Sequence, residues 1–88
     1  MEKIIETRVN RYKEHDLSYS LIRKSGGERE YYTLRAQISK EGYYMTKDAD
    51  DFTSNLREAR KMLLNLCVNM VTPMGLHDVI EDYLAENR

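Results

Sequence analysis

The spacing of apolar and polar residues predicts that the first half of the chain forms β-strands. The two kinds of residue alternate over residues 3–12, 17–24 and 31–40, which is the period of a strand with one covered face. Residues 3–12 would also suit one face of a helix, so that alternative stays open. Residues 43–46 add a short fourth strand, and residues 47–51 have the composition of a polar, acidic loop.

The clearest strand is residues 31–40. Its covered side holds Tyr32, Leu34, Ala36 and Ile38. Its other side holds Tyr31, Thr33, Arg35 and Gln37. Gly26-Gly27 before it and Glu41-Gly42 after it predict tight hairpin turns, because glycine accepts the positive φ that such turns need.

A helical period replaces the alternation from residue 55 onward. Apolar residues then recur at spacings of three and four on one helix face: Leu56, Ala59, Leu63, Leu66 and Met70. Residues 62–71 are apolar well beyond that face, and such a helix needs burial on several sides. Thr72-Pro73 begins a second helix, as N-cap and first helical residue, and one face of it is apolar.

Strands first and helices last predict an α+β fold. We expect an antiparallel meander sheet of three to four strands followed by two C-terminal helices packed on one face. The chain should form a single domain over residues 1–88, with a strand half at 1–47 and a helical half at 52–86. In its core, the sheet residues Leu34, Ala36 and Ile38 should meet three helix residues, Leu63, Leu66 and Ile80.

Composition places this domain among folded, soluble proteins, with 41% hydrophobic and 33% charged residues. The single cysteine, Cys67, cannot close an intrachain disulfide, so we expect a reducing compartment, the cytoplasm. The N-terminal residues are charged at once and show no signal peptide. The longest apolar stretch, residues 62–71, is too short for a membrane helix of about twenty residues, so no membrane partner is expected.

Charge divides the chain into a basic and an acidic half. Residues 1–47 hold ten Lys/Arg and seven Asp/Glu, a net of +3, and residues 48–88 hold four and eight, a net of −4; the two give the overall −1. This asymmetry favours weak electrostatic steering of a partner.

The acidic second helix is the first candidate site. Asp78 and Asp82 are four residues apart, as are His77 and Glu81, so each pair shares a strip of helix surface. Such groups can bind a cation or act as acid and base. No second cluster of ligands completes a coordination shell. We therefore assign no catalytic residue, metal ligand or cofactor, and treat Asp78, Glu81 and Asp82 as a candidate interaction surface.

Tyrosines interleaved with arginines in the strand half are the second candidate. A sheet face with exposed Tyr31 and Arg35 could stack bases and hold phosphates, as single-strand nucleic-acid binders do. The chain lacks the RNA-recognition, KH and cold-shock motifs, and its net charge is slightly negative. Nucleic-acid binding is therefore an alternative rather than the main expectation.

The surplus of apolar residues on the first helix is the third candidate. A second copy of the chain would cover the part that a small domain cannot bury, and methionine suits such adaptable surfaces. The residues expected in that homodimer contact are Met62, Leu64, Val68 and Met70.

The C-terminal segment Val71–Leu84 resembles a known family. Short proteins of unknown function from clostridia and related Gram-positive bacteria end in a similar T/S-P-x-x-L-x-D-V-V/I-E-D-Y/F-L pattern, matched here from Thr72 to Leu84. Many members have histidine where this chain has Gly75, and its own histidine is His77. The resemblance implies a small bacterial α+β protein and supplies no activity.

Taken together, these patterns predict a non-enzymatic cytoplasmic module that acts by binding another macromolecule, above all a protein, and that forms a homodimer. Two alternatives remain: binding of single-stranded nucleic acid through the Tyr/Arg sheet face, and metal-dependent activity at the acidic helix.

Overall fold

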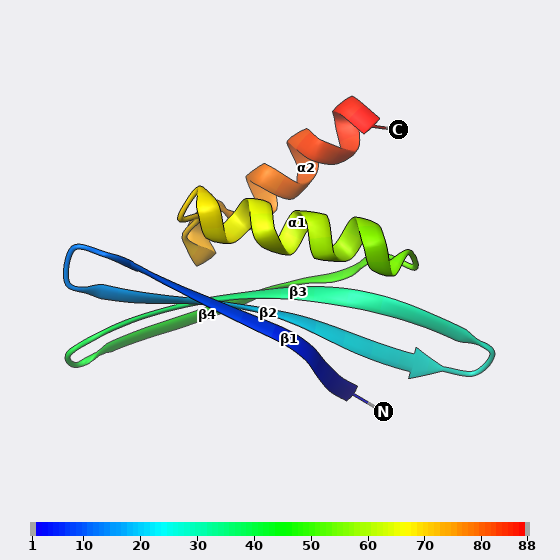
Figure 1. The fold of residues 1–88 in the computed structure, drawn as a ribbon, viewed down its shortest axis with the longest axis horizontal. Helices are drawn as coiled ribbons and strands as arrows, with labels where there is room; N and C mark the ends of the chain where they lie inside the picture. Colours follow the sequence, from blue (N-terminus) through cyan, green and yellow to red (C-terminus); the bar gives the residue numbers. More distant parts are fainter. Residues whose placement is uncertain (1, 88) are drawn as a thin grey trace.

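Four long strands are followed by two helices on one face of the sheet they form (Figure 1). The computed structural model describes residues 2–87. Its elements are β1 (Glu2–Tyr12), β2 (His15–Gly26), β3 (Arg29–Lys40), β4 (Tyr43–Thr53), α1 (Leu56–Val68), the 3₁₀ helix η1 (Pro73–Gly75) and α2 (Leu76–Asn87). The strands are antiparallel and neighbour one another in chain order. The predicted α+β meander is therefore confirmed.

Two-residue loops connect all four strands. Gly27 (φ 63°) and Gly42 (φ 76°) supply the left-handed residue in two of them, at the predicted glycines. The first loop has no glycine, and Lys13 takes the left-handed conformation there, with φ 56°. That conformation is strained for a residue with a Cβ atom.

The predicted loop at residues 47–51 is wrong, because β4 continues through it to Thr53. Aspartate is normally disfavoured in strands. Here the carboxylates of Asp48 and Asp50 lie 2.8 Å from Arg35 on β3 and 3.0 Å from Lys24 on β2, respectively, so their charge is balanced. A register shift near Asp51, whose φ is 50°, marks a bulge before the strand ends.

The core lies between the sheet and the helices, as the alternation in β3 predicted. Leu34 and Ala36 are buried in one cluster with Leu63, Leu66 and Ile80, and Ile38 packs at its edge; Leu34, Ala36, Leu63 and Leu66 have no exposed surface at all. The N-cap of α1 is Asn55, whose side-chain oxygen accepts a hydrogen bond from the Glu58 N–H (3.1 Å).

Strand β1 turns its polar side toward α1. The carboxylate of Glu6 lies 3.7 Å from the Arg60 guanidinium, and the Asn10 side-chain amide donates to the Cys67 carbonyl oxygen (2.9 Å). Val9 alternates with these residues, so its side chain lies on the opposite face and is 74% exposed. Polar contacts therefore hold this edge strand under the helix.

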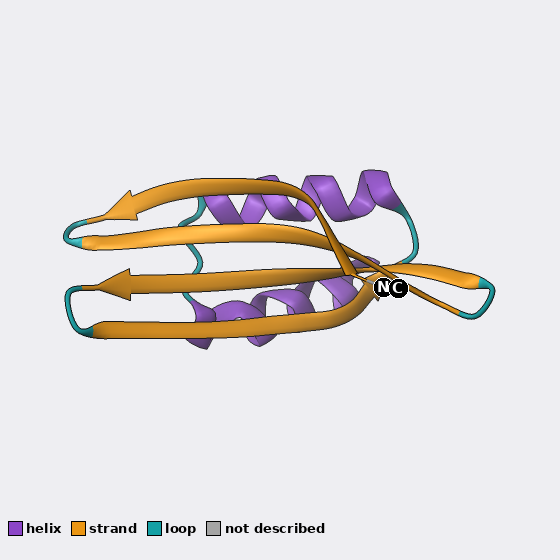
Figure 2. Cartoon of the chain, turned by 90° about the horizontal axis from the view of Figure 1, so that it is seen from below, coloured by secondary structure: helices purple, strands orange, loops and turns teal. Residues whose placement is uncertain are grey.

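The opposite face of the sheet carries no helix (Figure 2). We call it the open face. No helix within residues 2–87 is long and apolar enough to cross a membrane.

Candidate interaction surfaces

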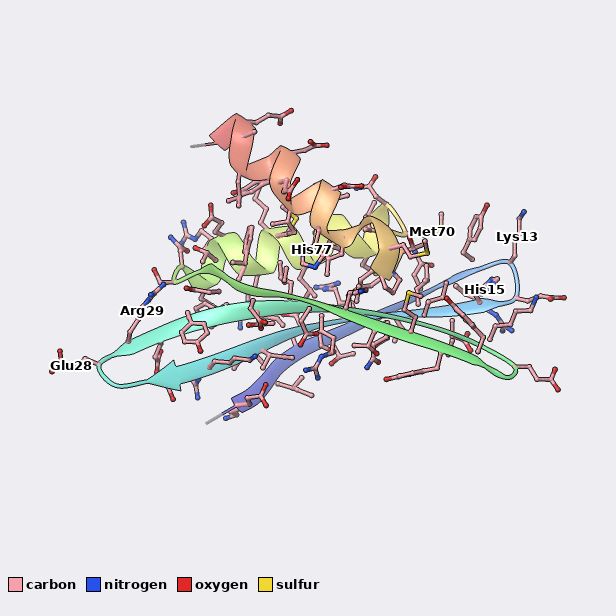
Figure 3. The ribbon with its side chains drawn as sticks, turned by 180° about the vertical axis from the view of Figure 1, so that it is seen from behind. Lys13, His15, Glu28, Arg29, Met70 and His77 are labelled. Atoms are coloured by element: carbon pink, nitrogen blue, oxygen red, sulfur yellow. The ribbon has the colours of Figure 1, made fainter. Side chains whose placement is uncertain are left out.

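The acidic residues of the second helix form an exposed surface on α2. Asp78, Glu81 and Asp82 are all exposed, as is His77 beside them (Figure 3). Among the described residues, no three His, Cys, Asp or Glu side chains come together in an arrangement that would hold a metal ion. The arrangement on α2 is therefore a solvated acidic strip.

Cations on the open face are each paired with a carboxylate. Arg35, predicted as a phosphate contact, forms two hydrogen bonds to Asp48 (2.8 and 3.0 Å), and this pairing raises the pKa of Arg35 further above its usual value. Lys24 pairs in the same way with Asp50 at 3.0 Å. A hydrogen bond from Lys24 lowers the pKa of the Asp50 carboxyl.

At the far end of this face, Arg11 lies 3.6 Å from Asp16. The open face thus presents neutral ion pairs rather than free cations, which is a poor surface for a phosphate backbone.

The strand tyrosines are distributed over both faces instead of forming one stacking platform. Tyr19 and Tyr32 are buried beneath the helices. Tyr31 is partly exposed on the open face, with the Arg29 guanidinium 5.7 Å from its ring centre, but Arg29 is itself paired with Asp51 (2.8 Å). The structure therefore does not bring Tyr31 and a free arginine together.

The predicted self-association residues separate into one core residue and three surface residues. Met62 is only 3% exposed and packs inside the chain, so it is unavailable to a partner. It lies on the same helix face as Ala59 and Leu66, because three or four residues separate it from each. Leu64, Val68 and Met70 are exposed, at 47%, 65% and 37%.

Exposed apolar side chains gather in one half of the molecule. This half, which we call the hairpin end, contains the β1–β2 and β3–β4 turns, the C-terminal half of α1 and η1 (Figure 1). Of the nine large hydrophobic residues that are exposed among those described, all except Ile4 lie here: Val9, Tyr12, Tyr43, Tyr44, Leu64, Val68, Met70 and Met74. These residues lie on both sides of the sheet, and Val9 and Tyr44 are brought together around one hollow. Exposed apolar residues that adjoin one another are typical of an interaction site, whereas scattered single residues are not.

The predicted contact residues include only three of the eight exposed residues of the hairpin end, Leu64, Val68 and Met70. Tyr43 and Tyr44 directly follow the predicted turn at Glu41-Gly42. Their position beside a turn could have indicated from the sequence that both side chains are exposed. Val9 and Met74 belong to segments far away in the chain, and the sheet order and the helix connection bring all of them to one end.

Met70 places its side chain at this end from a strained backbone. It follows α1 in the left-handed conformation (φ 51°), where helices usually have glycine. Val71 and Met70 donate backbone hydrogen bonds to Leu66 and Cys67, which close the helix in a Schellman motif. A large apolar residue at this position is an outlier that calls for a functional explanation.

A hollow of about 480 Å³ lies on the open face at the same end. Val9 on β1 and Tyr44 on β4 are among its lining residues, together with the smaller Ser18 and Ser39 of the central strands. Tyr44 accepts a hydrogen bond from Gln37 (2.8 Å). The hairpin end is therefore uneven in shape, with exposed apolar groups beside a hollow that could receive a side chain from a partner.

Comparison with known proteins identifies a family without assigning an activity. A family model described as a family of unknown function (DUF6514) matches residues 1–86. No curated protein and no solved structure matches the chain.

Proposed function

The chain belongs to the family of unknown function DUF6514, and we propose that it is a non-catalytic module that binds another protein through the hairpin end. The observation that carries this proposal is the position of the exposed apolar residues: of the nine large ones that the structure describes, eight lie in that half of the molecule.

The chemistry of the hairpin end fits a protein partner. Tyrosine and methionine are enriched at protein interfaces, and three tyrosines and two methionines are exposed here: Tyr12, Tyr43, Tyr44, Met70 and Met74. The hollow beside Tyr44 gives an incoming side chain a place to anchor, as interface hot spots require. The left-handed Met70 supports the same proposal, because it accepts backbone strain at this end.

The alternatives have weaker support. The three open-face cations Arg11, Lys24 and Arg35 are paired with carboxylates, which disfavours nucleic-acid binding there. For metal-dependent activity, the support is the proximity of His77 and Glu81 on α2. A bacterial origin rests on the resemblance of residues 72–84 to the clostridial motif, and a cytoplasmic location rests on the lone Cys67.

A comparison of captured proteins tests the proposal. The wild-type chain, a Val9→Ser/Tyr44→Ser variant and an Ile4→Ser variant are each used as bait in an extract of the producing cells. Ile4 is the matched control, because it is an exposed hydrophobic residue outside the hairpin end. We expect at least one protein to bind the wild type and the control but to be depleted at least about tenfold with the double variant.

All three baits should show the same circular dichroism spectrum, because exposed substitutions rarely change stability by more than about 0.5 kcal/mol. Equal capture by the double variant and the wild type would refute a role of the hairpin end.

A further inference from the structure

The outward surfaces of the two helices carry opposite charges. α1 exposes the three cations Arg57, Arg60 and Lys61. α2 contains no lysine or arginine and exposes four carboxylates: Asp78, Glu81, Asp82 and Glu86. Within residues 2–87, Arg60 is the one member of these seven that forms an ion pair, with Glu6. Six charged side chains of the helical layer therefore have no partner of opposite charge in the described chain.

On each helix, four of the exposed residues form a strip with the spacing of a helix-packing seam. On α1 the strip is Arg57, Lys61, Leu64 and Val68. From η1 through α2 it is Met74, Asp78, Glu81 and Ala85. Both strips step by four, three and four residues, the spacing by which helices pack side by side. One strip is basic and apolar, and the other is acidic and apolar.

We propose that two copies of the chain form a symmetric dimer in which α1 of each copy packs against α2 of the other. Within one chain α2 runs back in the direction opposite to α1 and rises away from the sheet toward its C-terminus (Figure 1). When the helical layers of two copies meet face to face, a two-fold axis parallel to α1 leaves the direction of each helix along that axis unchanged. The α1 helix of one copy therefore runs antiparallel to α2 of the other copy.

This symmetry brings the unpaired charges together. The middle of α2, where the helix rises from the sheet, carries Glu81 and Asp82, and the N-terminal half of α1 carries Arg57 and Lys61. In the antiparallel order, Lys61 meets Glu81 of the second copy, and Val68 meets its Met74. A face that stacked α1 on α1 would instead place cations against cations. The charge pattern thus selects the second copy as the occupant and sets its orientation.

The dimer is independent of the proposed partner site. It uses the outward side of the helices and would cover three residues of the hairpin end, Leu64, Val68 and Met74. The two proposals are tested separately through Val9 and Tyr44, which lie on the opposite side of the sheet and outside the dimer contact. Failure of one proposal leaves the other standing, because the Val9→Ser/Tyr44→Ser variant should dimerise like the wild type.

Charge reversal in two variants provides the test, with the dissociation constant of the dimer measured by sedimentation at low ionic strength. Lys61→Glu alone and Glu81→Lys alone each place like charges in both contacts of the dimer, and each should weaken dimerisation at least about tenfold. An equal mixture of the two variants should dimerise again, because every contact then joins a lysine to a glutamate. Added salt should weaken the wild-type dimer.

Three results would overturn this inference: a wild type that stays monomeric at every concentration, single variants that dimerise as well as the wild type, or a mixture no better than its components. Circular dichroism checks that the single variants are folded. If either is not, the Lys61→Glu/Glu81→Lys chain decides the question, because it should dimerise like the wild type and would refute the contact if it were monomeric.

Discussion

Replacing Tyr19 with phenylalanine removes one hydroxyl from beneath the helical layer. The Tyr19 side chain is fully buried on β2. Its hydroxyl donates a 2.8 Å hydrogen bond to the Val71 carbonyl oxygen, in the connection between α1 and η1. Because the substitution leaves this carbonyl without its donor, we expect Tyr19→Phe to lower the free energy of unfolding by about 1–3 kcal/mol.

The same hydroxyl links stability to alkaline pH. Burial, with a smaller effect of Cys67, raises the pKa of Tyr19 from 10.0 to about 12 in the folded chain. Above pH 10.0 the unfolded chain loses this proton while the folded chain keeps it, so wild-type stability falls as the pH rises toward about 12. Two pKa units correspond to about 2.7 kcal/mol. The advantage of the wild type over Tyr19→Phe is therefore complete below pH 10.0 and shrinks by up to that amount above it.

Urea denaturation followed by circular dichroism measures both effects. The difference between the two proteins is taken at each pH, from neutral to strongly alkaline, so that titrations common to both cancel. Tyr12→Phe is the matched control, because Tyr12 is exposed, and it should behave like the wild type. A difference between wild type and Tyr19→Phe that stays constant across the alkaline range would refute the reasoning from burial.

Three further predictions concern the sheet. Lys13→Gly should raise the free energy of unfolding by about 0.5–1 kcal/mol, because relief of the left-handed strain outweighs the added freedom of the unfolded chain; a lower thermal midpoint would contradict this. Arg35→Ala should lower the free energy of unfolding by about 1–2 kcal/mol, because it leaves the partly buried Asp48 without its partner. Arg11→Ala, which breaks a largely exposed ion pair, should lower it by less than about 0.5 kcal/mol. Equal losses of stability in the two variants would show that burial of the ion pair is irrelevant. Asn10→Ala should speed hydrogen exchange in β1 more than in β3, because it frees the edge strand from the Cys67 carbonyl, and uniform exchange would count against that contact.

Alternation and helical spacing were sufficient for the fold, because the apolar face of β3 is buried whereas Tyr31, Arg35 and Gln37 on its other face are partly exposed; Thr33 is the buried exception there. Because Tyr32, Leu34 and Ala36 alternate strictly with polar residues, only one strand register buries all three of them. The same logic failed for residues 47–51, because the partners that make Asp48 and Asp50 acceptable in a strand lie on β2 and β3. It also could not show that β1 turns Glu6 and Asn10, not Val9, toward α1, since those contacts come from the distant helix.

The candidate site could be predicted from the sequence less completely than the fold. Helical spacing identified Leu64 and Val68 as surplus apolar residues, and both are exposed. It could not separate them from Met62, which is buried in the core. The hairpin end joins side chains from β1, β4, α1, η1 and the connection between the two helices. Its existence therefore depends on the order of the strands and on the direction of that connection, which local sequence patterns do not specify.

A photo-crosslinking residue at position 44 tests the central claim most directly. It is introduced in place of Tyr44 in the chain expressed in its own cells, and in place of Ile4 in a matched control, since both side chains are exposed but lie in opposite halves of the molecule. Binding through the hairpin end predicts discrete adducts with another protein from position 44 and none from position 4. The absence of adducts at position 44, or the same adducts from both positions, would contradict it.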